Sequence, residues 1–168
     1  MPILIDGYNL LFARLGKVKL NSAEELERAR TALLTMLSSY ALTTREKITV
    51  FFDARNTPSM LSHREKCGTV DVVYVKSSSD ADTEIKQVIT KSRNPRVLLV
   101  VSSDRRLRDF TKAYGAKIVT SAAFLEDAVA AIETKPRRER EPKVKFTGPT
   151  RGEVDYWMKI FGGEDQEK

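Results

Sequence analysis

Acidic side chains recur at one kind of position in this chain, at the end of an apolar run or shortly after it. The four positions are Asp6, Asp53, Asp82 and Asp104. The apolar runs alternate with helical patterns, which predicts the strands of a parallel sheet. In such a sheet the carboxyl ends of the strands lie along one edge, where ligands bind. The four carboxylates are therefore expected to converge at that edge.

Converging carboxylates point to a particular kind of chemistry. They repel one another, so they persist only when they are protonated, paired with cations or bound to a metal. Oxygen ligands alone suit Mg²⁺ or Mn²⁺, and the chain has no Cys/His cluster for zinc. Ions held in this way characteristically act on phosphates, where they activate a water and stabilise the leaving oxygen. The pattern predicts a Mg²⁺ or Mn²⁺ site for phosphate-ester chemistry.

Each acid taken singly also has a simpler interpretation. Asp80, Asp82 and Asp104 stand at expected helix starts, where carboxylates cap backbone N–H groups for stability alone. Asp53 could be an ordinary turn residue after its strand. Capping does not explain why the acids share one end of the sheet, and Asp6 directly ends the first strand. The case for a site depends on the whole set.

Composition limits the class of protein. The 168 residues suffice for one domain with a core, the hydrophobic fraction is 41%, and no apolar run is long enough to cross a bilayer. The lone Cys67 and the lack of a leader pattern lead us to expect a cytoplasmic protein with no membrane partner. The net charge of +6 favours a polyanionic partner, nucleic acid first.

The elements that must position these acids alternate between two patterns. Strands are expected over residues 2–5, 47–52, 70–75, 97–101 and 117–119. Helices are expected over 22–42, 80–93, 104–115 and 121–132, with N-caps at Ser22, Asp80, Asp104 or Ser103, and Ser121. A tight turn is expected after Asp6 and a loop over 54–69. The alternation predicts a parallel sheet with right-handed crossovers.

The character of the chain changes from Thr134. Residues 135–145 carry two prolines, few apolar side chains and a net positive charge, which predicts an extended linker. Residues 152–161 include Trp157 and Phe161 and predict a short docking helix. The expected organisation is a globular domain over 1–133, followed over 134–168 by a basic linker and a short C-terminal docking segment.

Four acidic blocks, in this order, resemble those of NYN domains, a branch of the PIN-like nucleases. The blocks are Ile5-Asp6-Gly7-Tyr8-Asn9, Val50-Phe51-Phe52-Asp53, Ala81-Asp82-Thr83-Glu84-Ile85 and Val101-Ser102-Ser103-Asp104. The bacterial YacP-like subfamily, with its basic, Trp-containing tail, is the most similar. The resemblance covers roughly residues 2–132. It implies a PIN-like three-layer α/β/α sandwich with a mainly parallel central sheet, a basic C-terminal extension, and an NYN/PIN-like nuclease domain over 1–133.

The resemblance also implies an activity and its residues. The protein is expected to be a Mg²⁺- or Mn²⁺-dependent endoribonuclease that leaves a 5′-phosphate and a 3′-hydroxyl. The catalytic acids of the family fall on Asp6, Asp82 and Asp104, and Asp53 matches a further acid as a metal ligand. The family's asparagine falls on Asn9, which would orient Asp6 or a bound phosphate.

Other side chains are expected to support the acids or to hold RNA. Thr83 and Ser103 would keep the ligands in place. RNA phosphates would be bound by Arg55, Arg64, Lys66, Arg105, Arg106, Arg137 and Arg138, although a solvated surface explains each of them equally well. His63 could act as a general base, but a metal-bound water makes this unnecessary. Tyr8 and Phe12 could stack on bases or pack in the core, and packing is favoured for Phe12.

YacP-like proteins include ribosome-associated endonucleases that cut messenger RNA, so RNA, messenger RNA in particular, and the ribosome are the expected partners.

Two other functions compete with that of an endoribonuclease. The alternative is a non-catalytic RNA- or ribosome-binding module with the same fold, against which the retained acids argue. A phosphohydrolase with an aspartyl nucleophile is a third class, and it lacks its Asp-x-Asp pair because Gly7-Tyr8 follow Asp6.

Overall fold

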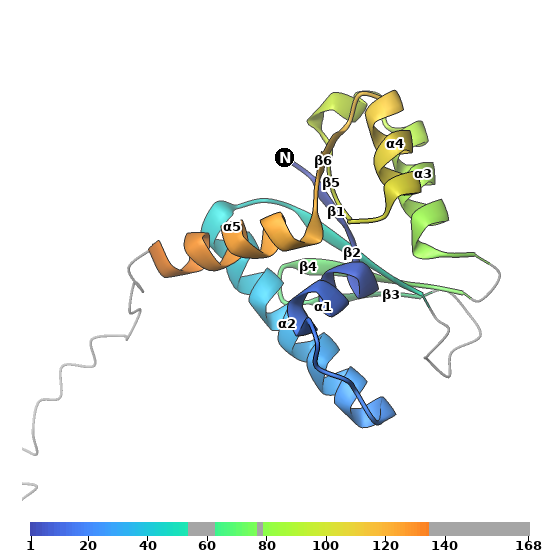
Figure 1. Ribbon diagram of the computed structural model, residues 1–168. Coiled ribbons are helices and arrows are strands. Elements are labelled where there is room, and N and C mark those ends of the chain that lie inside the picture. Colours follow the sequence, from blue (N-terminus) through green and yellow to red (C-terminus); the bar gives the residue numbers. More distant parts are fainter. Residues whose placement is uncertain (54–62, 77–78, 135–168) are drawn as a thin grey trace, which may run out of the picture. The chain divides into compact units, whose positions relative to one another are not determined.

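A six-stranded sheet forms the centre of the structure, a computed structural model in which residues 1–53, 63–76 and 79–134 are described (Figure 1). The strands are β1 Ile3–Asp6, β2 Ile48–Asp53, β3 His63–Cys67, β4 Val70–Val75, β5 Leu99–Val101 and β6 Lys117–Val119. They are ordered β3-β4-β2-β1-β5-β6, and every neighbouring pair is parallel except β3 with β4. The mainly parallel sheet expected from the sequence is confirmed.

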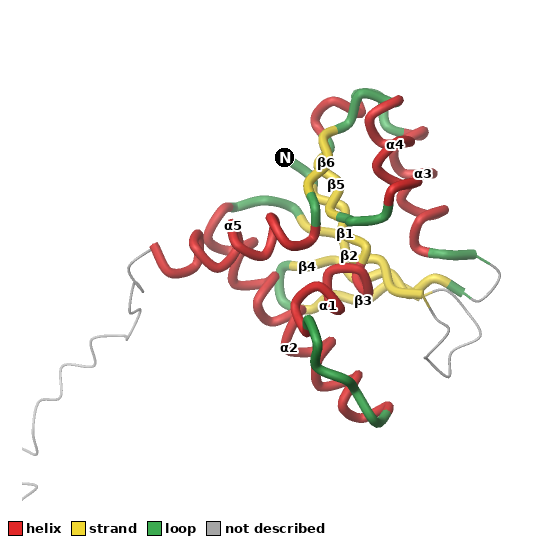
Figure 2. Tube along the Cα trace, viewed as in Figure 1, coloured by secondary structure: helices red, strands yellow, loops and turns green. Residues whose placement is uncertain are grey.

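Helices cover both faces of this sheet (Figure 2). They are α1 Gly7–Leu15, α2 Ala23–Thr44, α3 Ala81–Lys91, α4 Arg105–Ala113 and α5 Ser121–Thr134, with a short 3₁₀ turn, η2, over Pro95–Val97. Buried residues of α1, α2 and α5 share one core with one face of the sheet, and those of α3 and α4 share the other core with the opposite face. This is the three-layer α/β/α arrangement that the resemblance implied.

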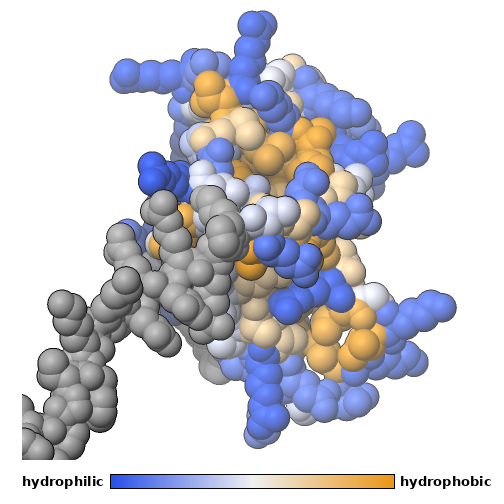
Figure 3. Space-filling model, turned by 90° about the vertical axis from the view of Figure 1, so that its left-hand side faces the viewer, coloured by the Kyte–Doolittle hydropathy of each residue, from blue (hydrophilic) through white to orange (hydrophobic). Residues whose placement is uncertain are grey.

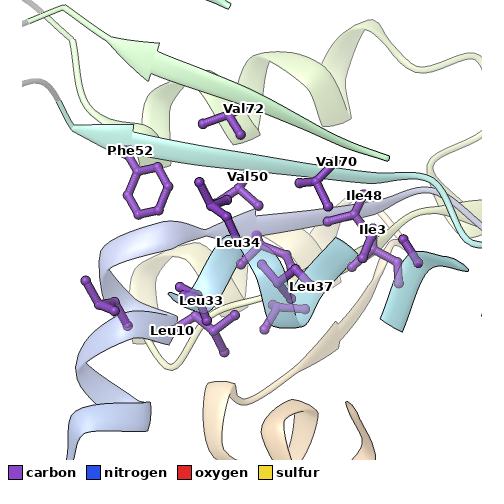
Figure 4. Packing of buried hydrophobic residues seen from close by; sticks show 14 of the residues in the cluster. Ile3, Leu10, Leu33, Leu34, Leu37, Ile48, Val50, Phe52, Val70 and Val72 are labelled. Atoms are coloured by element: carbon purple, nitrogen blue, oxygen red, sulfur yellow. The ribbon is translucent and has the colours of Figure 1, made fainter. Parts of the chain in front are cut away.

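Alternation along β1 divides its side chains between the two cores. Ile3 and Ile5 point towards α1, α2 and α5, whereas Leu4 points towards α3 and α4. Figure 4 shows the first of these cores, where Leu33 and Leu37 of α2 pack against the strands. Burying side chains of this size contributes roughly 1.5–3 kcal/mol each, which fixes α2 on the sheet and so fixes the path that leads from β1 to β2.

The order of the strands creates one switch point. From β1 the chain proceeds outwards through β2 to β4, and it then returns to form β5 on the other side of β1. In open sheets of this kind ligands bind outside the carboxyl ends of the strands that flank such a reversal. Here those are the ends of β1 and β5, where Asp6 and the segment 102–104 lie.

Two expectations about local structure were wrong. No tight turn follows Asp6, because α1 begins at Gly7 and Asp6 is at once the last residue of β1 and the N-cap of α1. The loop expected over 54–69 contains strand β3, His63–Cys67, while residues 54–62 lie outside the described part. The strand is mostly polar and pairs on one side only, so it has no apolar pattern, as is common for sheet edges.

The expected helix starts were correct in three cases and wrong in one. The side chains of Ser22, Asp80 and Asp104 each accept a hydrogen bond from a backbone N–H in the first turn of the helix that follows. Ser121 is not a cap but the first residue of α5, and it is buried. The hydroxyl of Thr120 accepts the N–H of Ala123 instead, at 3.3 Å. The hydroxyl of Ser121 is thereby available for another contact.

The expected linker and docking segment, with Trp157 and Phe161, fall on residues 135–168 and lie outside the described residues. Within residues 1–53, 63–76 and 79–134, no helix combines the length and the apolar character needed to cross a membrane.

Candidate active site

Asp6 stands at the junction between β1 and α1. Its Oδ1 accepts the backbone N–H of Asn9 at 3.1 Å, and its Oδ2 accepts the hydroxyl of Ser102 at 3.4 Å. A glycine must follow, because a Cβ at Gly7 would lie 2.5 Å from the ring of Phe52. The missing side chain allows α1 to start directly against β2, and this close approach fixes the carboxylate of Asp6 at the edge of the sheet.

The electrostatic environment of Asp6 is unfavourable for its charge. Burial raises the pKa of this carboxyl from 3.8 to about 6, against the lowering effect of the Asn9 N–H. The carboxylates of Asp82 and Asp53 contribute to this rise, and the hydrogen bond from the Ser102 hydroxyl opposes it. Asp6 is therefore an acid that is held mostly out of water and that faces other acids.

Asp82 is the second acid of this group. It lies in the first turn of α3, and no hydrogen bond to its carboxylate is found among the described residues. Burial raises its pKa, the Asp104 carboxylate raises it further, and the Lys86 ammonium one turn along α3 lowers it. Helix capping does not account for Asp82, in contrast to Asp80, which fills that role at the same helix.

Asp104 and Asp53 have a structural contact in addition to their charge. Oδ1 of Asp104 accepts the N–H of Leu107 at 2.8 Å and so caps α4. Oδ1 of Asp53 accepts the N–H of Ala81 at 2.6 Å, which ties the end of β2 to the start of α3. Both acids raise the pKa of Asp82. The structure thus brings together all four aspartates that the sequence singled out, and three of them, Asp6, Asp53 and Asp104, also hold the start of a helix.

Asn9 connects three distant segments. Its Oδ1 accepts the N–H of Ser103 at 2.9 Å and the hydroxyl of Ser121 at 2.7 Å. A backbone N–H can only donate, so the atom that faces it must be the amide oxygen, and the NH₂ group of Asn9 points elsewhere. The hydroxyl of Ser103 accepts the N–H of Ser121 at 3.2 Å, which completes a ring of polar contacts around the switch point.

Ser102 joins two of the acids. Its buried hydroxyl donates to Oδ2 of Asp6 and accepts the N–H of Asp104 at 3.1 Å. The sequence predicted no site role for Ser102 or Lys86, and Ser121 was expected only as a helix cap. The Ser102-Ser103-Asp104 block contained a signal for Ser102, since a serine next to an acid often contacts it. No local signal could have indicated Ser121, which lies 112 residues from its partner.

The remaining predicted residues lie at various distances from the acids. Thr83 is exposed, and its backbone N–H donates to Asp80. Arg105 and Arg106 are exposed in the first turn of α4, directly after Asp104. Arg55, Arg137 and Arg138 lie outside the described residues.

The two basic residues of β3 do not join this group. Arg64 of β3 is paired with Val73 of β4, Val73 with Phe51 of β2, and Phe51 with Asp6 of β1. Three strand spacings of about 4.8 Å therefore separate Arg64 from Asp6. Lys66 lies further towards the amino ends of the parallel strands, and its Nζ is 3.9 Å from the carboxylate of Asp71.

The aromatic residues near the site differ from one another in burial. The ring of Tyr8 packs edge-on against the buried ring of Phe52, with centroids 5.2 Å apart. Phe12 was expected to pack in the core, which was wrong, since 55% of its surface is exposed. His63 stacks on Tyr74 at 4.5 Å and is held at the edge of the sheet.

The acids approach one another without closing into a compact ligand set. Among the residues that the structure describes, no three His, Cys, Asp or Glu side chains stand together as a group that could hold a metal ion. The electrostatic coupling of Asp6, Asp82 and Asp104 nevertheless extends across the carboxyl ends of β1 and β5. The result is an acidic edge at the switch point, held by a partly buried network of serine and asparagine contacts.

A mainly parallel three-layer sandwich with acids at its switch point is the architecture of a PIN-like fold. The family model of the YacP-like NYN domain matches residues 3–152, and the chain belongs to this family. The protein YacP of Bacillus subtilis (strain 168) is 31% identical over 150 residues, which cover 86% of this chain and 82% of that protein. The NYN/PIN-like superfamily suggests a nuclease with a role related to RNA.

Solved structures share the fold. The crystal structure of Rae1 (YacP) from Bacillus subtilis is similar with a TM-score of 0.64 and 23% sequence identity, over 96% of this chain and 91% of that chain. A crystal structure of a single-substitution mutant of Rae1 (YacP) gives the same TM-score and identity, over 79% and 77% of the two chains. At this level of identity the likeness supports the fold alone.

Proposed function

We propose that this protein is a divalent-metal-dependent endoribonuclease whose reaction is centred on Asp6, Asp82 and Asp104. The observation that carries the proposal is the acidic edge, where burial and neighbouring carboxylates raise the pKa of Asp6 to about 6. Such an arrangement destabilises the fold unless a cation neutralises it. Membership of the YacP-like NYN family supports a nuclease, and the net charge of +6 favours a nucleic acid as the partner.

The donor set fits Mg²⁺ or Mn²⁺. It consists of carboxylate oxygens, which are the ligands that these ions prefer. Mg²⁺ usually keeps several waters and is held by one or two carboxylates together with substrate phosphates, so it does not require a closed group of three acids. Asp6, Asp82 and Asp104 would hold the ion. One oxygen of Asp53 already accepts the backbone N–H of Ala81, so Asp53 would contribute its charge.

When bound, the ion would supply an activated water for attack on the scissile phosphate and a positive charge near the leaving oxygen. The chain's own residues would set the geometry. Ser102 and the N–H of Asn9 fix both oxygens of Asp6. Because its oxygen is bound to Ser103 and Ser121, Asn9 has its NH₂ group available to donate to a phosphate oxygen. Thr83 and Ser103 would act only through the backbone and the network around them.

Cationic side chains next to the acids would hold the RNA backbone. Arg105 and Arg106 are exposed beside Asp104, and Lys86 is close enough to Asp82 to lower its pKa. Such contacts supply affinity that depends on salt but not on sequence. Arg64 and Lys66 lie further along the sheet and would contact only RNA that extends beyond the site. Arg55, Arg137 and Arg138 remain candidates from the sequence alone.

We extend the proposal to messenger RNA on the ribosome, which is the substrate implied by the sequence resemblance and is compatible with the basic charge of the chain. The test compares cleavage of one messenger RNA free in solution and in translating ribosomes. Faster cleavage in the translating sample is expected, and equal rates would remove the ribosome from the proposal.

A non-catalytic RNA-binding module is the second candidate. The absence of a three-acid ligand group from the described residues is the observation that favours it. The two functions differ in one experiment, in which the full chain is incubated with single-stranded and structured RNAs, with Mn²⁺ or with chelator. Cleavage that needs Mn²⁺ and is lost in Asp6→Asn supports the nuclease. RNA binding without cleavage under every condition, translating ribosomes included, supports the module.

A further inference from the structure

The exposed ring of Phe12 has no role in the site described so far. Tyr8, one turn earlier on α1, stacks against it with centroids 5.9 Å apart and ring planes at 20°. Tyr8 in turn packs on Phe52, which is fully buried, and the hydroxyl of Tyr8 is itself buried. The ring of Phe12 is therefore exposed to solvent and packs on Tyr8, which in turn contacts the core.

The position of Phe12 relates it to the acidic edge. Helix α1 begins directly after Asp6, so Phe12 lies six residues, or about 9 Å along the helix axis, from that acid. Asn9 is three residues before Phe12 and is its neighbour on the helix surface. A polymer bound at the acidic edge would reach the ring within a short length of chain.

The surface around Phe12 is basic and partly apolar. Residues 12–20 contain Arg14, Lys17 and Lys19 and no acid, and all three cations are exposed. A groove of about 790 Å³ lies between this segment and the start of α2, and its lining includes Phe12, Val18, Lys19, Leu20 and Leu26. Figure 3 shows one side of the molecule, where hydrophobic residues reach the surface between hydrophilic ones.

We propose that Phe12, supported by Tyr8, stacks on an unpaired base of RNA bound at the acidic edge, and that Arg14, Lys17 and Lys19 follow its phosphates. An exposed aromatic ring beside cations is what single-stranded nucleic acid binds, because every base has a face that can stack. A base in a duplex is already stacked on its neighbours. The proposal rests on the proposed function for the location of the scissile phosphate, and what it adds is a base-stacking position and a path for the phosphates on α1 and the segment after it.

The experiment measures binding without cleavage. The full chain, in chelator, is titrated into a single-stranded RNA that carries 2-aminopurine, and into the same RNA annealed to its complement. Phe12→Ala is expected to weaken single-strand binding about 5- to 100-fold and to abolish the fluorescence change caused by stacking. Phe12→Trp should retain both. Leu42→Ala, which removes another exposed apolar side chain from α2, is the matched control and should bind like the unchanged protein.

Three results would overturn the inference: no binding of single strands by the unchanged protein, equal affinity for single strand and duplex, or unchanged binding by Phe12→Ala. Failure of the proposed function gives a different result. In that case Phe12→Ala still weakens single-strand binding, but no metal or substrate produces cleavage. A salt titration adds a check, because replacing Lys17 and Lys19 together by Gln should reduce the slope of log K against log salt by up to about 2.

Discussion

Asp6 and Asp71 lie on strands of the same sheet, Asp6 at the carboxyl ends of the parallel strands and Asp71 near their amino ends. The surroundings of the two carboxylates differ. Asp71 is near the start of β4, and its carboxylate oxygens are 3.9 Å from the ammonium groups of Lys47 and of Lys66. Asp6 ends β1, and the charges that it faces are those of Asp82 and Asp53. One acid has cations for partners, and the other has acids.

The difference separates an acid that needs no ligand from an acid that does. Exposed ion pairs such as those of Asp71 contribute about 0–1 kcal/mol, and they leave Asp71 with cations beside it and no need for a further ligand. At the carboxyl edge the charge of Asp6 opposes folding, as its raised pKa indicates. Local arrangements that reduce stability are expected where a protein binds or reacts.

The largest effect is expected from removing an acid at the carboxyl edge. Asp82→Asn should lower the rate of RNA cleavage on the order of a thousandfold, because the proposed ion would lose a ligand charge worth several kcal/mol in the transition state. Asp71→Asn removes the same charge at the opposite edge and should stay within twofold. Cleavage rates at saturating Mn²⁺ provide the measurement. Equal losses in both variants would show that only the net charge matters.

A smaller effect is expected on stability. The unfolded chain loses the Asp6 proton near pH 4 and the folded chain holds it to about pH 6, so the metal-free protein should lose about 2–3 kcal/mol of stability as the pH rises between these values. Urea unfolding in chelator at pH 4.5 and 7.5 measures the loss. Asp6→Asn should be more stable than the unchanged protein at pH 7.5, whereas Asp71→Asn should retain the pH dependence. A flat profile in the unchanged protein would contradict the strain assigned to Asp6.

The smallest effect is expected from the network around Asn9. Ser121→Ala removes the hydroxyl that donates to Asn9, so it should lower kcat about 10-fold and change KM little. Ser38→Ala is the matched control, since the Ser38 hydroxyl accepts the N–H of Thr69 away from the acids, and its kcat should stay within twofold. If both variants lose activity in proportion to stability, Ser121 has only a structural role.

The sequence predicted those features whose signals are local. Examples are the apolar run that forms β5, just before Ser102, and the helix caps at Ser22 and Asp80. Each of these signals comes from residues within a few positions of each other. Strand β3 could not be predicted in this way, because an exposed edge strand needs no apolar face. Helix α1 was missed because Asp6 acts both as strand end and as cap, which removes the turn that the pattern suggested.

The residues of the candidate site were likewise predictable only where their signals are local in the sequence. The four aspartates could be found because each follows an apolar run and because parallel strands share an edge. The contacts that hold these aspartates could not be predicted, because they join residues distant in the sequence. Ser102 is 96 residues from Asp6, and Ser103 is 94 residues from Asn9. The exposure of Phe12 was likewise hidden, because its position on α1 depends on which face of that helix meets the sheet.

The polar ring around Asn9 also has a consequence for how the protein is made. Synthesis proceeds from the N-terminus, so Asp6 and Asn9 emerge first, and the two serines that hold the Asn9 amide emerge about a hundred residues later. A nascent chain that stops before Ser121 has the first acid but no hydroxyl to hold Asn9 in position. The contacts that hold Asn9 can therefore be complete only once β6 and the start of α5 have been added.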